Sequence, residues 1–163
     1  MAQIDLVDVQ SLLDVLARTP SEVAGLVNAV PKDHRRTRPT PEEFSVVENV
    51  CHLRDIEVDG YAQRITRILN ETNPTLADVD GARLAIERDY NNQELAPALE
   101  TFRQTRERNV GLLRNLAEGD FDRQASLQGV GEITLRKLIV MMNEHDEGHL
   151  DELGRISNLR FQT

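Results

Sequence analysis

The sequence predicts an all-α protein, an up-and-down bundle of four helices in a single domain that spans residues 1–163. Three observations lead to this fold class. Four segments repeat apolar residues with the helical period, and none shows a sustained strand alternation. Aromatic residues make up only 4% of the chain, so Leu, Val, Ile and Ala must form the core, which is typical of helices packed on helices. The length of 163 residues is enough to bury one such core.

The first predicted helix covers about residues 5–30. Its apolar positions keep one phase throughout and are Val9, Leu12, Leu13, Leu16, Val23, Val27 and Val30. The segment Thr19-Pro20-Ser21-Glu22 interrupts this stripe and resembles a capping box with proline at the first helical position. Because the phase is unchanged across Pro20, we expect a kinked or briefly broken helix that packs on one neighbour.

The second predicted helix begins near Pro41-Glu42-Glu43, after a proline-rich loop, and runs to about Asn70 before Asn73-Pro74 ends it. Its main apolar stripe is Val47, Val50, Cys51, Val58, Tyr61, Ile65, Ile68 and Leu69. Cys51 belongs to this stripe, so we expect an inert core thiol rather than a nucleophile.

Two more helices complete the bundle. Residues 75–91 are polar, with Gly81 in the middle, and predict at most a short helix; the third long helix follows at about 93–117. Residues 121–133 contain two glycines and predict an extended loop or a small hairpin. Thr134 then caps the fourth helix, which runs to about Asn158. Four amphipathic helices with connections of mixed length favour a four-helix bundle.

Charge and composition limit the partners. The formal net charge of −9 repels polyphosphate, which argues against nucleic-acid binding. A basic cluster at residues 32–38 lies in a proline-flanked loop without aromatic residues, so a solvated loop is the favoured interpretation. No apolar run is long enough to cross a membrane, and no signal-peptide pattern begins the chain. A lone cysteine fits a reducing compartment. We therefore expect a soluble, cytoplasmic protein.

The most informative residues are two histidines in the fourth helix. His145 and His149 lie one turn apart, so both imidazoles can reach the same metal ion. Both belong to the apolar stripe of this helix, which is made of Leu135, Leu138, Ile139, Met142, His145, His149, Leu153 and Ile156. A metal would satisfy two of their buried ring nitrogens. The alternative is a pair of partly exposed, hydrogen-bonded histidines, and the H-E-x-x-H pattern of zincins is not present.

His52 is the candidate third ligand, since the remaining histidine, His34, lies in a loop. On a helical wheel, however, His52 points about 140° away from the main apolar stripe of the second helix. It shares its side with Glu48, Asp55 and Asp59, so periodicity alone favours an exposed polar residue. If His52 is a ligand, the site must lie in a solvent-reachable groove between the second and fourth helices.

Three motifs resemble the DinB/YfiT superfamily. The segment Phe44-Ser45-Val46-Val47-Glu48-Asn49-Val50-Cys51-His52-Leu53-Arg54-Asp55 is similar to the family's aromatic-Ser-x-x-Glu start of helix two and its His-Leu-x-Asp continuation. Gly131-Glu132-Ile133-Thr134-Leu135 and His145-Asp146-Glu147-Gly148-His149 are similar to the start and the end of the family's helix four. The resemblance covers nearly the whole chain. Phe44 stands where tryptophan is common, and we expect it to act in packing.

The resemblance implies a four-helix bundle in which His52, His145 and His149 bind Ni²⁺ or Zn²⁺, with frequent homodimers. Three imidazoles leave a coordination position open, as in catalytic metal sites. Relatives with an assigned activity imply a metal-dependent enzyme acting on a small molecule, either a hydrolase or a transferase that uses a low-molecular-weight thiol. The alternative is a non-enzymatic, stress-associated metal-binding dimer.

Two carboxylates of the second helix are candidates for catalysis. Glu48 and Asp55 lie about one turn before and after His52, so they can share its face and act as a base or orient the histidine. A solvated acidic face is the alternative interpretation.

Overall fold

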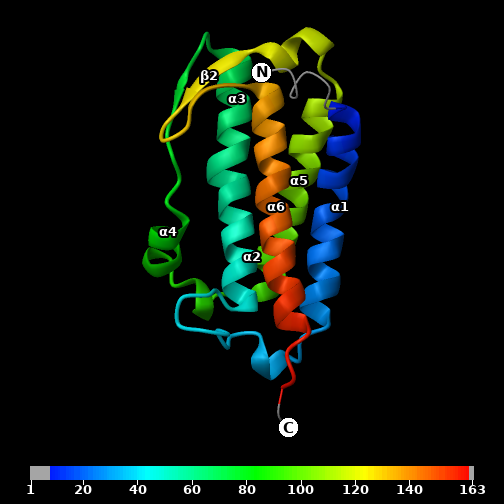
Figure 1. Ribbon diagram of the computed structural model, residues 1–163, viewed down its shortest axis with the longest axis vertical. Coiled ribbons are helices and arrows are strands. Elements are labelled where there is room, and N and C mark those ends of the chain that lie inside the picture. The colour runs from blue at the N-terminus through cyan, green and yellow to red at the C-terminus, as the bar shows by residue number, and fades with distance from the viewer. Residues whose placement is uncertain (1–7, 162–163) are drawn as a thin grey trace.

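The computed structural model describes residues 8–161 and confirms the four-helix bundle (Figure 1). The long helical stretches are α1 (Val9–Asn28), α5 (Leu95–Arg114), α6 (Leu135–Ser157) and a continuous rod. This rod consists of α2 (Val46–Asp55), the π-helical segment η2 (Ile56–Tyr61) and α3 (Ala62–Asn70). The shorter elements are η1 (Lys32–His34), β1 (Thr75–Leu76), α4 (Gly81–Glu87), η3 (Tyr90–Asn92), η4 (Glu118–Asp122), β2 (Gln124–Leu127) and β3 (Gly131–Thr134).

The helices are arranged so that α1 and α2 each pack against both α5 and α6. The α2–α3 rod and α5 run in the same direction, as two contacts show. Leu95 at the start of α5 lies beside Val47 at the start of α2. Farther along both helices, Arg106 and Asn109 of α5 donate to Glu57 of η2. A long crossover, residues 71–94, makes this possible by returning along the outside of the bundle beside α2 (Figure 1). The apolar pattern of the helices does not reveal this crossover.

A small three-stranded sheet lies at one end of the bundle (Figure 1). The strands β2 and β3 pair antiparallel, with Gln124 opposite Thr134, and confirm the predicted hairpin. Its turn needs backbone angles that favour glycine, since φ is +79° at Gly129 and +105° at Gly131. The crossover begins with β1, which pairs parallel to β2 and was not predicted.

The start of the second helix and the possible break in the first helix differ from the prediction. The second helix begins at Val46 rather than near residue 41, because Ser45 and Glu48 form a reciprocal capping box there. The segment Thr19–Glu22 starts no helix, since α1 continues across it and the Thr19 hydroxyl donates to the Val15 carbonyl. The first helix is therefore unbroken, with Asp8 as its N-cap. Residues 5–7 of the predicted helix lie outside the described residues.

The core consists of two apolar clusters, one at each end of the bundle, with a buried polar layer between them. Arg106 lies in this layer and is only 1% exposed. It pairs with Glu57 of η2 at 2.8 Å and with Asp146 of α6 at 2.6 Å. Its guanidinium also donates to the Leu16 carbonyl of α1 at 3.0 Å. Pro20 has no N–H to offer that carbonyl, so Arg106 supplies the donor that the helix lacks.

None of the helices among residues 8–161 combines the length and apolar character needed to span a membrane.

Candidate metal centre

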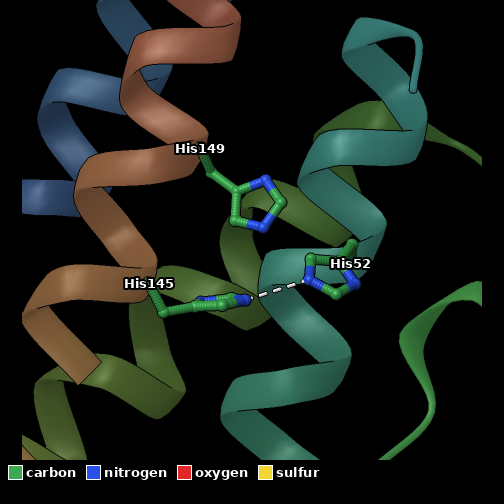
Figure 2. Close-up of side chains that lie close together, drawn as sticks. All are labelled: His52, His145 and His149. Atoms are coloured by element: carbon green, nitrogen blue, oxygen red, sulfur yellow. Dashed lines mark hydrogen bonds between the residues drawn. The ribbon is translucent and has the colours of Figure 1, made fainter. Parts of the chain in front are cut away.

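The structure brings the three predicted histidines together at the level of the polar layer, between α2 and α6. His52 of α2 faces His145 and His149 of α6 (Figure 2). The Nε2 atoms of His52 and His145 are 3.0 Å apart, and one ring nitrogen from each of the three residues lies within 4.8 Å of the others. These three histidines form a triad between the second and fourth long helices.

The protonation of these imidazoles suits metal binding. Burial, followed by the neighbouring histidines, lowers the pKa of His52 to about 3. Burial, followed by the charges of His149, Arg106 and Arg64, lowers the pKa of His145 to about 3. Both rings are therefore neutral at pH 7, and each has one nitrogen lone pair available to a metal.

The unmet hydrogen bonds of the site also fit a metal. At 3.0 Å, the facing Nε2 lone pairs of His52 and His145 repel each other unless a proton or a cation lies between them. The Nδ1 atoms of His52 and His145 are buried and have no hydrogen-bond partner among residues 8–161. Buried polar atoms are rarely left unpaired. A divalent cation would accept lone pairs that converge in this way, and imidazole nitrogen suits Zn, Ni, Fe or Cu better than Mg or Ca.

His149 is held by residues that sequence reasoning missed. Its Nδ1 is 2.8 Å from Oδ1 of Asn49, whose amide nitrogen donates to the Ser45 carbonyl at 3.1 Å. This second bond fixes the Asn49 oxygen toward the ring, so His149 carries its proton on Nδ1 and keeps the Nε2 lone pair free. The Glu152 carboxylate is 3.5 Å from the same Nδ1. Asn49 lies about one helical turn before His52, and Glu152 lies about one turn after His149. This spacing was the signal by which the sequence could have indicated both residues.

The wheel argument against His52 is wrong because the crossover covers that face of α2. The His52 ring packs between Phe44, at a centroid distance of 5.6 Å, and Gly81 at the start of α4. A Cβ atom at Gly81 would lie only 2.4 Å from Cε1 of His52. Phe44 thus acts in packing, as expected. Glu48 is only 1% and Asp55 only 5% exposed, so the alternative of a solvated acidic face is wrong.

Glu48 and Asp55 bind other partners than the histidines. The Glu48 carboxylate pairs with Arg38 and accepts from the Ser45 N–H. Burial would raise its pKa, but these two partners outweigh burial and hold the pKa below its usual value. Among residues 8–161, Glu48 makes no hydrogen bond to a triad histidine.

The Asp55 carboxylate accepts from Arg54 at 2.7 Å, from Arg88 at 2.8 Å and from the Tyr90 hydroxyl at 2.6 Å. Burial would raise its pKa, but these donors hold the pKa below its usual value. Asp55 therefore ties the crossover to α2 and, within the described part of the chain, hydrogen-bonds none of the three histidines.

Two other predicted features have structural roles. The Cys51 side chain is fully buried, and burial raises the pKa of its thiol to about 11, as expected for an inert core residue. The basic loop is anchored by its own arginines: Arg35 donates to the Val30 carbonyl at 2.9 Å, and Arg36 donates to the Gln93 carbonyl at 3.0 Å.

Comparison with known proteins identifies the family. The sequence model of the DinB superfamily matches residues 16–153. The chain belongs to the DinB superfamily. It is 26% identical over 133 residues to the uncharacterized protein YuaE of Bacillus subtilis (strain 168), covering 73% of this chain and 80% of YuaE.

The fold is also that of a solved member of this bundle type. The structure is similar to that of YfiT from Bacillus subtilis, with a TM-score of 0.84 and 21% sequence identity over 91% of this chain and 85% of that one. YfiT is described as a probable metal-dependent hydrolase with an unusual four-helix bundle topology.

Proposed function

We propose that this DinB-superfamily protein is a divalent-metal-dependent hydrolase of small molecules. The observation that carries the proposal is the convergence of His52, His145 and His149, with the Nε2 atoms of His52 and His145 only 3.0 Å apart. The description of YfiT as a probable metal-dependent hydrolase supports it. The three imidazoles would hold Ni²⁺ or Zn²⁺, and the ion would supply Lewis acidity at an open coordination position.

The chain's own residues then divide the remaining work. Asn49 keeps the proton of His149 on Nδ1 and thereby directs its Nε2 toward the cluster. Among residues 8–161, Glu152 is the carboxylate nearest to one of the three histidine rings, 3.5 Å from Nδ1 of His149, and its side chain is 38% exposed. This contact with His149 holds its pKa below the usual value. An ionised, accessible carboxylate can take a proton from a reacting group. We therefore assign the base role to Glu152, while Glu48 and Asp55 hold α2, its loop and the crossover in place.

The finer parts of this function rest on the family resemblance. These parts are a low-molecular-weight thiol as co-substrate, a homodimeric state and a cytoplasmic location. The alternative function, a non-enzymatic metal-binding dimer, has the same histidine cluster and differs only in turnover.

Turnover assays test the proposal. Purified protein, loaded with Ni²⁺ or Zn²⁺ or stripped with a chelator, is assayed with p-nitrophenyl acetate and, separately, with a small thiol plus an electrophile. We expect ester hydrolysis that requires the metal, disappears in His52→Ala and persists in His34→Ala. Turnover only with the thiol and the electrophile would show that the protein is a thiol transferase and not a hydrolase. Metal binding without turnover in either assay would favour the non-enzymatic alternative.

The base role has its own test in Glu152→Gln, which should lower kcat by about 100-fold while the metal content stays unchanged. Asp151→Asn, at the neighbouring exposed carboxylate, is the matched control. An unchanged kcat in Glu152→Gln would remove Glu152 from the base role.

A further inference from the structure

Arg64 of α3 is a buried, charged residue. The residue is 9% exposed, and no carboxylate of residues 8–161 forms an ion pair with it. Its Nε is buried and has no hydrogen-bond partner within the described part of the chain, and one Nη donates to the Ala77 carbonyl of the crossover at 3.2 Å. Arg106, the other deeply buried arginine, has two carboxylates. Arg64 therefore differs from a structural buried arginine.

This unpaired guanidinium lies next to the histidine cluster. Its central carbon lies over the Tyr61 ring, 5.7 Å from the ring centroid. The same Tyr61 ring meets the ring of His145 edge to face, with centroids 6.1 Å apart. Tyr61 thus connects the guanidinium to a triad histidine, and cation–π contact with its ring holds the guanidinium in place without neutralising it.

Burying an ionised group without a counter-ion is unfavourable, so an anion that binds beside Arg64 would stabilise this arrangement. A planar guanidinium with free N–H groups matches a carboxylate, which can accept two parallel hydrogen bonds. We propose that Arg64 binds a carboxylate of the substrate, while the metal held by the three histidines contacts the reacting end of the same molecule. This inference rests on the proposed metal function and names the substrate class: small molecules that carry a carboxylate.

Two thiol probes of equal size separate this charge recognition from metal binding. The probes are 3-mercaptopropionate and its neutral amide, 3-mercaptopropionamide. Both offer the same sulfur to a Co²⁺-loaded protein, and the sulfur-to-cobalt absorption band gives the dissociation constant of each without an activity assay. The ratio of the two constants measures the preference for the carboxylate.

We expect the wild-type protein to bind the carboxylate probe about tenfold more tightly than the amide. This ratio corresponds to the net free energy of one hydrogen bond to a charged group. Arg64→Gln should lose this preference while its affinity for the amide stays unchanged, and Arg64→Lys should keep part of it. Arg67→Gln is the matched control, because Arg67 lies on the same helix but is exposed and pairs with Glu71 at 2.7 Å. It should keep the full preference.

The outcomes distinguish the two levels of the proposal. An equal preference in wild type and Arg64→Gln, with Co²⁺ and both thiols bound, would overturn the carboxylate subsite alone. Failure of the wild-type protein to take up Co²⁺ would overturn the metal function and the subsite together. Loss of amide binding in Arg64→Gln would make Arg64 a structural residue and would also overturn the subsite.

Discussion

At the scale of the residue, the position of His52 depends on a glycine in a distant segment. Gly81 lies against the imidazole, and its missing side chain leaves the space that Cε1 and Nδ1 of His52 occupy. The sequence indicates that Gly81 breaks a polar stretch, but it gives no sign of this contact, because the contact arises only when the crossover packs on α2.

Replacing Gly81 by alanine should therefore displace His52. The new Cβ would lie 2.4 Å from Cε1 and 2.6 Å from Nδ1, and the side chain of His52 is the part that can move. We expect metal affinity to fall by about 10- to 100-fold in Gly81→Ala, as for other changes to residues that orient a ligand. Equilibrium titration with Zn²⁺ measures it.

Gly154→Ala provides the control, because a Cβ atom there meets nothing within 4 Å. It should leave the affinity unchanged and stabilise α6 by about 0.5–1 kcal/mol, since alanine favours a helix over glycine. Equal affinities of Gly81→Ala and wild type would contradict the positioning role of Gly81.

The site residues differ in how far sequence predicts them. His145 and His149 follow from their spacing on an apolar stripe, whereas periodicity argued against His52 and only the family resemblance supported it. The partners of Glu48 and Asp55 are Arg38 and Arg88, which come from other segments. Helical spacing describes one helix at a time, so it could not exclude these two carboxylates from the metal site.

At the scale of the element, Arg106 joins α1, η2, α5 and α6 in one buried network. The residue lies one turn after Phe102 on the inward side of α5, but sequence analysis takes a charged residue as solvated unless its partners are known. The partners, Glu57 and Asp146, lie on two other helices, which is why the network could not be predicted.

Removing the Arg106 charge should destabilise the fold strongly. Arg106→Met leaves the buried carboxylates of Glu57 and Asp146 without a counter-ion, which costs about 3–5 kcal/mol of unfolding free energy. Urea unfolding measures the loss. The triple variant with Glu57→Leu and Asp146→Leu should recover much of it, since an apolar replacement leaves no charge unpaired.

Arg103→Met is the matched control one turn earlier on the same helix. Arg103 pairs with Glu100 and Glu107 at the surface, with its side chain 52% exposed, so its removal should change stability little. Equal losses in the two single variants would contradict the account of the buried network.

At the scale of the whole molecule, the bundle contains a polar layer between two apolar clusters, and the histidines lie at its edge. The helices, the hairpin and the location of the site between α2 and α6 were predicted, because they follow from periodicity, glycine positions and motif resemblance. The crossover and the parallel pair formed by the α2–α3 rod and α5 were not predicted. Both depend on which helices pack against each other, and the pattern of a single helix does not show this.

This layer should make the metal-free protein sensitive to acid. His52 and His145 have a pKa of about 3 in the folded protein and an ordinary value of 6.5 in the unfolded chain. Between these pH values the unfolded chain binds more protons than the folded protein does. The free energy of unfolding should therefore have its full value above pH 6.5 and fall as the pH drops toward 3. Chelator-treated protein, unfolded in urea at a series of pH values, tests this.

In the double variant His52→Gln/His145→Gln the decline below pH 6.5 should be shallower, since two of the titrating groups are gone. A decline of the same slope in the variant would show that other groups cause the acid sensitivity.

Elemental analysis decides whether His52, His145 and His149 hold one divalent metal ion. The purified protein is incubated with Ni²⁺ or Zn²⁺, dialysed, and measured beside His145→Ala and His34→Ala. A three-histidine site predicts about one ion per chain in the wild type and in His34→Ala, and almost none in His145→Ala. Equal metal content in His145→Ala, or no metal in the wild type, would contradict it.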